Sequence, residues 1–149
     1  MRPINYILIN DSTPAAPRGK FSDISIANLG HHYVINSQGK VLNPIDIRLP
    51  GTFLEHEVPY MEQRERKRLS QYSIGIKFNG SLKPETLNWE LRALLIRLLV
   101  TLRSRFPAAK ILGLSELVPE TKNLKPGTRG VIRPSDAMNQ IRRTLSDLP

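Results

Sequence analysis

The longest hydrophobic pattern in the chain lies between residues 83 and 106, and it predicts a helix. Seven apolar residues recur there at helical spacing: Leu87, Leu91, Leu94, Leu95, Leu98, Leu102 and Phe106. Trp89, Ile96, Leu99 and Val100 widen this stripe, so we expect a helix that is buried along most of its girth, with Trp89 inside. Pro84 suits an early helical position, and Pro107 ends the helix.

Short apolar runs predict the strands of a sheet. Residues 5–10, 72–79 and 109–114 are rich in apolar and β-branched side chains and are bounded by turn residues. Residues 30–36 and 40–43 have the pattern of a hairpin, in which Gly39 supplies the left-handed turn residue. Strands that alternate with a long helix indicate an α/β fold, and 149 residues are enough for one domain with a real core.

Between the predicted strands the pattern is weaker. We expect a short helix over residues 21–29 with Ser22 or Asp23 as its N-cap. Residues 44–59 are expected to be irregular, and residues 117–133 are expected to form a loop along the edge of the sheet.

A last helix is expected to begin near residues 134–136, where serine and aspartate follow proline. Its spacing turns three apolar side chains inward and two arginines outward: Met138, Ile141 and Leu145 against Arg142 and Arg143.

The net charge of the chain favours anionic partners but does not identify one of them. The chain has 22 Lys and Arg against 13 Asp and Glu, a net charge of +9, which favours nucleic acid, anionic lipid or acidic cell-wall polymers. The charged run at residues 61–69 is expected to be a short exposed helix or an ordered loop. Its best interpretation is a solvated face with pairs such as Glu62–Arg66, and contact with nucleic acid or an anionic polymer is the sharper alternative.

The absence of cysteine and the lengths of the apolar runs limit the reactions and the cellular locations that we expect for the chain. The chain has no cysteine, which excludes disulfides, thiolate zinc ligands and thiol nucleophiles. Arg92 and Arg97 interrupt the longest apolar run and the N-terminus lacks a signal-peptide pattern, so we expect no transmembrane segment. A cytoplasmic location follows, or the cell envelope if another route exports the chain.

Few residues in the sequence are candidates for catalysis or for metal binding. His31 and His32 are adjacent on a predicted strand and must face opposite sides, so they cannot both ligate one metal. No serine-histidine-acid order, phosphate-binding glycine loop or nucleotide fingerprint is present. Asn10 and Asp11 end the first strand, and ligands of α/β sheets usually bind at such strand ends.

Four motifs occur in a specific order along the chain. They are the first strand with its polar end (residues 7–13), Gly-His-His-Tyr-Val-Ile (30–35), Tyr-Ser-Ile-Gly-Ile (72–76), and Arg-Phe-Pro to Ile-Leu-Gly (105–113). In this order the chain resembles the type 2 N-acetylmuramoyl-L-alanine amidases, zinc-dependent enzymes that include phage lysozyme amidases and the peptidoglycan recognition proteins. The resemblance covers most of residues 1–149. It implies a mixed central sheet with helices on both faces and a muropeptide groove at the rim of the sheet.

The resemblance also implies where a zinc ion would bind. In that family two histidines and a third ligand hold a zinc that activates water and polarises the amide carbonyl. The histidine positions fall on Asn10 and Leu114, and the third position falls on Lys122 or Leu124, depending on the gap chosen. Leucine cannot donate to zinc, and lysine would first have to lose a proton. We therefore expect that the zinc site is lost and that no cofactor is bound.

Neighbouring positions differ from the family as well. By resemblance, the tyrosine that assists catalysis aligns with His31, an acidic residue aligns with Lys77, and a basic residue that steadies the oxyanion aligns with Lys122. His32 matches a family histidine with a structural role. The former site is then lined by Asn10, His31, Lys77, Leu114 and Lys122.

Three hypotheses follow. The first is a degenerate amidase-like domain that binds peptidoglycan fragments or a protein partner. The second is an active amidase that cleaves the MurNAc–L-Ala bond with zinc in a rebuilt site, for which the candidate ligands are His31, Asp11, Glu116 and His56. The third is a basic interaction protein that binds nucleic acid or a polymerase through residues 64–68 and the pair Arg142 and Arg143, since some phage amidases that the chain resembles bind RNA polymerase.

Overall fold

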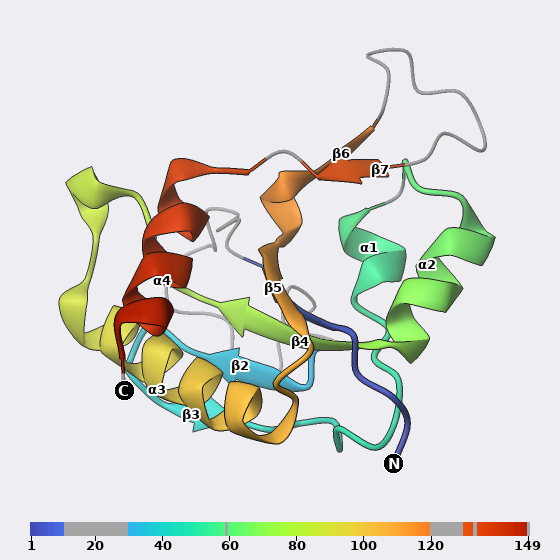
Figure 1. Cartoon of the computed structure of the whole chain (residues 1–149), viewed down its shortest axis with the longest axis horizontal. Helices are drawn as coiled ribbons and strands as arrows, with labels where there is room; N and C mark the ends of the chain where they lie inside the picture. The colour runs from blue at the N-terminus through green and yellow to red at the C-terminus, as the bar shows by residue number, and fades with distance from the viewer. Residues whose placement is uncertain (11–29, 59, 120–129, 133, 149) are drawn as a thin grey trace.

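A mixed five-stranded sheet runs through the centre of the chain in the computed structural model (Figure 1). The strand order is β3-β2-β4-β1-β5, formed by β1 (Tyr6–Asn10), β2 (Tyr33–Ile35), β3 (Val41–Leu42), β4 (Ser73–Phe78) and β5 (Lys110–Gly113). β1 lies parallel to β4 and β5, β2 lies parallel to β4, and only β3 is antiparallel to its neighbour. The predicted α/β fold with a mixed sheet is therefore confirmed.

The structure describes residues 1–10, 30–58, 60–119, 130–132 and 134–148. The helix expected over residues 21–29 lies outside these residues, as do Asp11, Lys122 and Leu124.

The two faces of the sheet carry two separate cores. Along β1, Ile7 and Ile9 face the core under α3 (Trp89–Arg105) and α4 (Asp136–Asp147), whereas Leu8 faces the opposite side. On that second side, residues in and around α1 (Leu54–Glu57) and α2 (Gln63–Gln71) pack against Leu8 and Leu112. This alternation follows from the two-residue period of a strand. Helices on both faces agree with the architecture that the resemblance implied (Figure 1).

The long helix is shorter and less buried than its apolar content suggested. It begins at Trp89, where Asn88 accepts hydrogen bonds from the backbone N–H groups of Glu90 (3.0 Å) and Leu91 (3.1 Å), and Pro84 belongs to a separate turn, η2 (Pro84–Thr86). Its buried side chains are Leu91, Leu95, Leu99 and Leu102. Trp89 is 71% exposed, so the expectation of a buried tryptophan is wrong. Trp89 precedes Leu91 by two residues and therefore points about 200° away from the buried row.

The predicted hairpin between β2 and β3 is confirmed. Gly39 has a φ of +84°, a conformation that residues with a Cβ rarely adopt. The side chain of Asn36 accepts hydrogen bonds from the backbone N–H groups of Gln38 (3.1 Å) and Lys40 (2.8 Å), which holds the turn.

Two segments that we expected to be irregular contain regular structure. Residues 44–59 include α1, and residues 117–133 include β6 (Leu117–Pro119) and β7 (Gly130–Ile132), which pair antiparallel. These elements are only three or four residues long, and such short runs carry little periodicity.

The charged run forms α2, one of the two structures expected for it, and the predicted last helix is confirmed, since α4 begins after the N-cap Ser135. Within the described ranges, no helix is long and apolar enough to cross a membrane.

Candidate functional site at the strand ends

Three buried polar side chains lie near the carboxyl ends of β1 and β4. Asn10 is the last residue of β1 and lies beside Lys77 of β4 in the register of the sheet. Both side chains are fully buried, as is His31, which precedes β2. Asn10 follows Leu8 by two residues and therefore lies on the face that carries α1 and α2. The structure thus brings together three of the residues that the sequence assigned to the former site.

Phe53 positions His31 at this edge. The two rings stack with centroids 4.9 Å apart and planes inclined by 25°. The amide nitrogen of Asn10 lies 3.3 Å from His31 Nε2, and because an amide N–H can only donate, this imidazole nitrogen accepts the bond. The lone pair that a zinc ion would need at Nε2 is therefore directed toward Asn10.

Phe53 itself is held against the backbone of β4. A Cβ built on Gly75 would lie 2.3 Å from Phe53 Cε1, so only glycine leaves room for the ring. Our sequence analysis did not identify Phe53 as a site residue. The available signal was Gly75, since a glycine inside a strand often marks a close approach by another group.

Leu114 occupies the other former histidine position. β5 ends at Gly113, which pairs with Ile9, so Leu114 follows at the edge where Asn10 lies. Its side chain is buried in the same apolar cluster as Phe53. Lys122 and Leu124, the candidates for the third position, are outside the described residues.

The described side chains at this edge do not fit a zinc ion. Among the residues that the structure describes, they are one imidazole, one amide, one amine and one alkyl group, whereas zinc sites in proteins use imidazole, thiolate or carboxylate ligands. In the part of the chain that the structure describes, no three His, Cys, Asp or Glu side chains gather into a possible metal site.

Glu116, a candidate ligand for a rebuilt zinc site, is held in a different network. It lies in η3 (Leu114–Glu116) and is fully buried. Its two carboxylate oxygens accept hydrogen bonds from the two terminal nitrogens of Arg142, each at 2.8 Å. The backbone N–H groups of Gly113 and Ser135 donate to the same carboxylate at 2.9 Å each. Glu116 therefore joins the end of β5 to the start of α4. Of the other proposed ligands, Asp11 and the side chain of His56 are outside the described structure.

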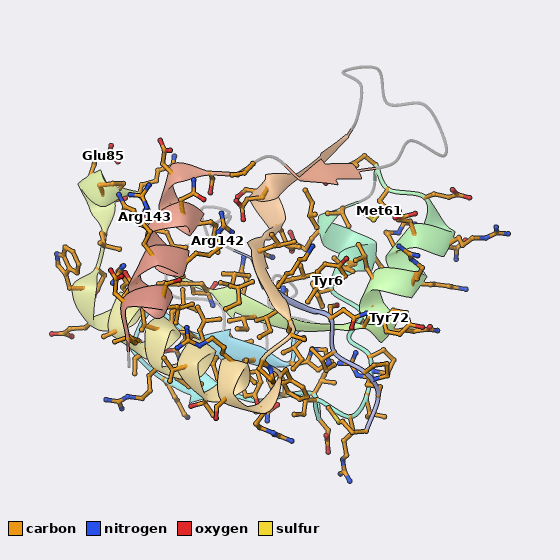
Figure 2. The ribbon with its side chains drawn as sticks, viewed as in Figure 1. Tyr6, Met61, Tyr72, Glu85, Arg142 and Arg143 are labelled. Atoms are coloured by element: carbon orange, nitrogen blue, oxygen red, sulfur yellow. The ribbon has the colours of Figure 1, made fainter. Side chains whose placement is uncertain are left out.

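The expected outward orientation of Arg142 is wrong. Figure 2 shows Arg142 on the side of α4 that faces β5, and Arg143 on the opposite side. Besides Glu116, Arg142 donates to the carbonyl of Ile111 at 3.0 Å. Burial raises the pKa of Glu116, but the hydrogen bonds from Arg142 and two backbone N–H groups outweigh it, and the net pKa lies below the usual value. Both charges are therefore retained at neutral pH.

The side chain of His32 links β4 to the loop that contains Leu49. Its Nδ1 accepts from the N–H of Gly75 at 2.9 Å, so the neutral ring carries its proton on Nε2, which donates to the carbonyl of Leu49 at 2.7 Å. Burial and the nearby charge of Arg2 lower the pKa of His32, and they outweigh the opposing effects of the Leu49 carbonyl and Asp46. A neutral His32 thus links β4 to the preceding loop, in agreement with the structural role that the resemblance implied.

The charged run places three basic side chains on one exposed face of α2. Arg64, Lys67 and Arg68 are exposed, and Lys67 and Arg68 follow Arg64 by three and four residues. Arg66 instead lies 3.6 Å from Glu55 of α1 in an ion pair.

Comparison with known proteins adds no relative: no family model matches the sequence, and no curated protein matches it significantly. The likeness to the amidases therefore rests on the four motifs and their order.

We predict that Gly75→Ala lowers the free energy of unfolding by about 1–3 kcal/mol, because the added methyl group overlaps the buried Phe53 ring. In a Phe53→Leu background the same change should cost clearly less, since the smaller side chain gives room. Urea unfolding of the two single variants and the double variant measures this coupling. Equal losses in both backgrounds would show that the ring does not press on Gly75.

We predict that Arg142→Ala lowers the free energy of unfolding by about 2–4 kcal/mol, because it leaves the Glu116 carboxylate buried without its ion-pair partner. The control is Arg143→Ala, which removes the exposed neighbouring arginine and should change stability by no more than about 0.5 kcal/mol. Chemical denaturation at neutral pH compares the two. Similar losses for both variants would contradict the assigned role of the Glu116–Arg142 pair.

Proposed function

We propose that this chain is a degenerate amidase-like domain that binds a peptidoglycan fragment at the ends of its parallel strands without zinc hydrolysis. One observation carries the proposal: the edge that would hold the metal contains Asn10, His31 and Lys77 in place of a zinc donor set. Ligands of parallel sheets bind at this edge, and the protein retains polar side chains there.

The chemistry of these side chains suits a peptide that carries carboxylates. The amine of Lys77 can donate, the amide of Asn10 can both donate and accept, and the imidazole of His31 can do the same. Peptidoglycan stem peptides offer amides and carboxylates as partners. The net charge of +9 adds a long-range attraction for an anionic polymer.

A second candidate function rests on the basic face of α2. Arg64, Lys67 and Arg68 would suit nucleic acid or an acidic surface of a protein such as a polymerase. Combined substitution of the three by glutamine should then abolish retention on DNA at low salt and leave muropeptide binding unchanged. Tight binding to DNA or to a protein partner, together with no response to muropeptide, would favour this function over the first.

We predict that untagged protein in EDTA binds N-acetylmuramoyl-L-alanyl-D-isoglutamine with a saturable heat in isothermal titration and releases no free peptide. Lys77→Met keeps the length of the side chain but removes its hydrogen-bonding amine, so the dissociation constant should rise about 10- to 100-fold.

The control is Lys67→Met, which removes a lysine from the exposed face of α2 and should bind as the unmodified chain does. Circular dichroism of both variants establishes that they fold. Absence of heat, loss of binding in EDTA, or release of L-alanyl-D-isoglutamine would each contradict the proposal.

A further inference from the structure

The buried imidazole of His32 is the point at which three segments of the chain meet. Its Nδ1 accepts a hydrogen bond from the N–H of Gly75 in β4 at 2.9 Å. Its Nε2 donates to the carbonyl of Leu49, in the loop between β3 and α1, at 2.7 Å. The guanidinium of Arg2, from the N-terminal segment, lies beside the ring, with 3.0 Å between Nη2 and Nε2.

This arrangement suits only the neutral form of the ring. A second proton on Nδ1 would face the N–H of Gly75, so two donors would meet and the hydrogen bond would be lost. Protonation would also place a positive charge beside Arg2, which is held by the carbonyls of Ile47 and Ser70 at 3.0 Å each. Burial, and to a smaller extent the charge of Arg2, lower the pKa of His32. The neutral ring therefore stabilises the fold fully above pH 6.5, the unperturbed value, and this stabilisation is lost as the pH falls.

A protonated ring would lose its contact with β4 but keep its contact with the loop. Nε2 carries a proton in both forms, so its bond to the carbonyl of Leu49 persists. Within the described residues, the charged groups that act on His32 are Arg2, which repels the cation, and Asp46 of the same loop, which attracts it. Hydrogen bonds from Arg48 lower the pKa of Asp46 to about 2, so this carboxylate keeps its charge in weak acid. Both charges therefore favour movement of the protonated ring away from β4 and with the loop.

This loop ends at the aromatic ring that positions the candidate site. Phe53 packs on Gly75 of β4 and stacks on His31. Gly51 brings the loop against the ring of His32, since a Cβ at Gly51 would lie 3.0 Å from His32 Cε1. The imidazole of His32 and the ring of Phe53 thus meet β4 at the same glycine. Movement of the loop away from β4 would draw Phe53 away from His31.

We propose that His32 is an acid-sensitive switch for the candidate site. When the imidazole takes up a second proton from solvent, residues 46–53 separate from β4, Phe53 leaves His31, and the affinity of this edge for its ligand falls. The effect on ligand binding rests on the proposed function, whereas the movement of the loop does not.

Nuclear magnetic resonance between about pH 7.5 and pH 5 tests the switch in the unmodified chain. The ring signals of His32, the amide signal of Gly75 and the ring signals of Phe53 should titrate together, with a midpoint below 6.5. In His32→Gln, whose amide takes up no proton in this range, the Gly75 and Phe53 signals should stay constant. A Gly75 signal that stays constant while His32 titrates would overturn the switch. Loss of the far-ultraviolet circular dichroism at the same midpoint would also overturn it, because the whole chain would then unfold.

Ligand binding separates the switch from the proposed function. The dissociation constant for N-acetylmuramoyl-L-alanyl-D-isoglutamine, whose carboxylate stays ionised in this range, should rise by up to about tenfold per pH unit below the His32 midpoint. In His32→Gln it should not change with pH. Signals that titrate together with no heat from the muramyl peptide at any pH would refute the proposed function and retain the loop movement. Equal affinity above and below the midpoint, in a chain whose Gly75 signal titrates, would overturn the control of the site.

Discussion

The contact between Phe53 and Gly75 organises the candidate site. The ring lies on the backbone of β4 so closely that no side chain fits at position 75, and it stacks on His31 from the same position. His31 in turn meets Asn10 at the end of β1. A single close approach, possible only at a glycine, thus connects the second apolar core of the sheet to the polar side chains at its edge.

The parts of the fold that were predictable have clear periodicity. β1 and β4 are buried apolar strands, and α4 turns Met138, Ile141 and Leu145 inward, as their spacing indicated. Trp89 could not be placed from its hydrophobicity, since its direction depends on which row of leucines the sheet covers. The ion pair between Glu116 and Arg142 was also missed, because the partners are 26 residues apart and nothing in their local pattern connects them.

Part of the candidate site was predictable for a different reason. Strand ends identify an edge, and the order of motifs assigned Asn10, His31, Lys77 and Leu114 to it before any coordinates were known. The residues that hold these side chains in position were not predictable, because Phe53 lies in a segment without periodicity. At this edge the described side chains include an amine, an amide and an imidazole, whereas the resemblance implies two histidines and a third ligand around a zinc ion. We propose binding and not hydrolysis because these described side chains are not a zinc donor set.

The zinc content of the purified chain tests this account most directly. Protein prepared without a histidine tag and equilibrated with zinc chloride, then freed of unbound metal by gel filtration, is measured by inductively coupled plasma mass spectrometry. The account predicts far less than one zinc per chain. One tightly held zinc per chain that is lost on changing Asn10 or His31 to alanine would contradict it.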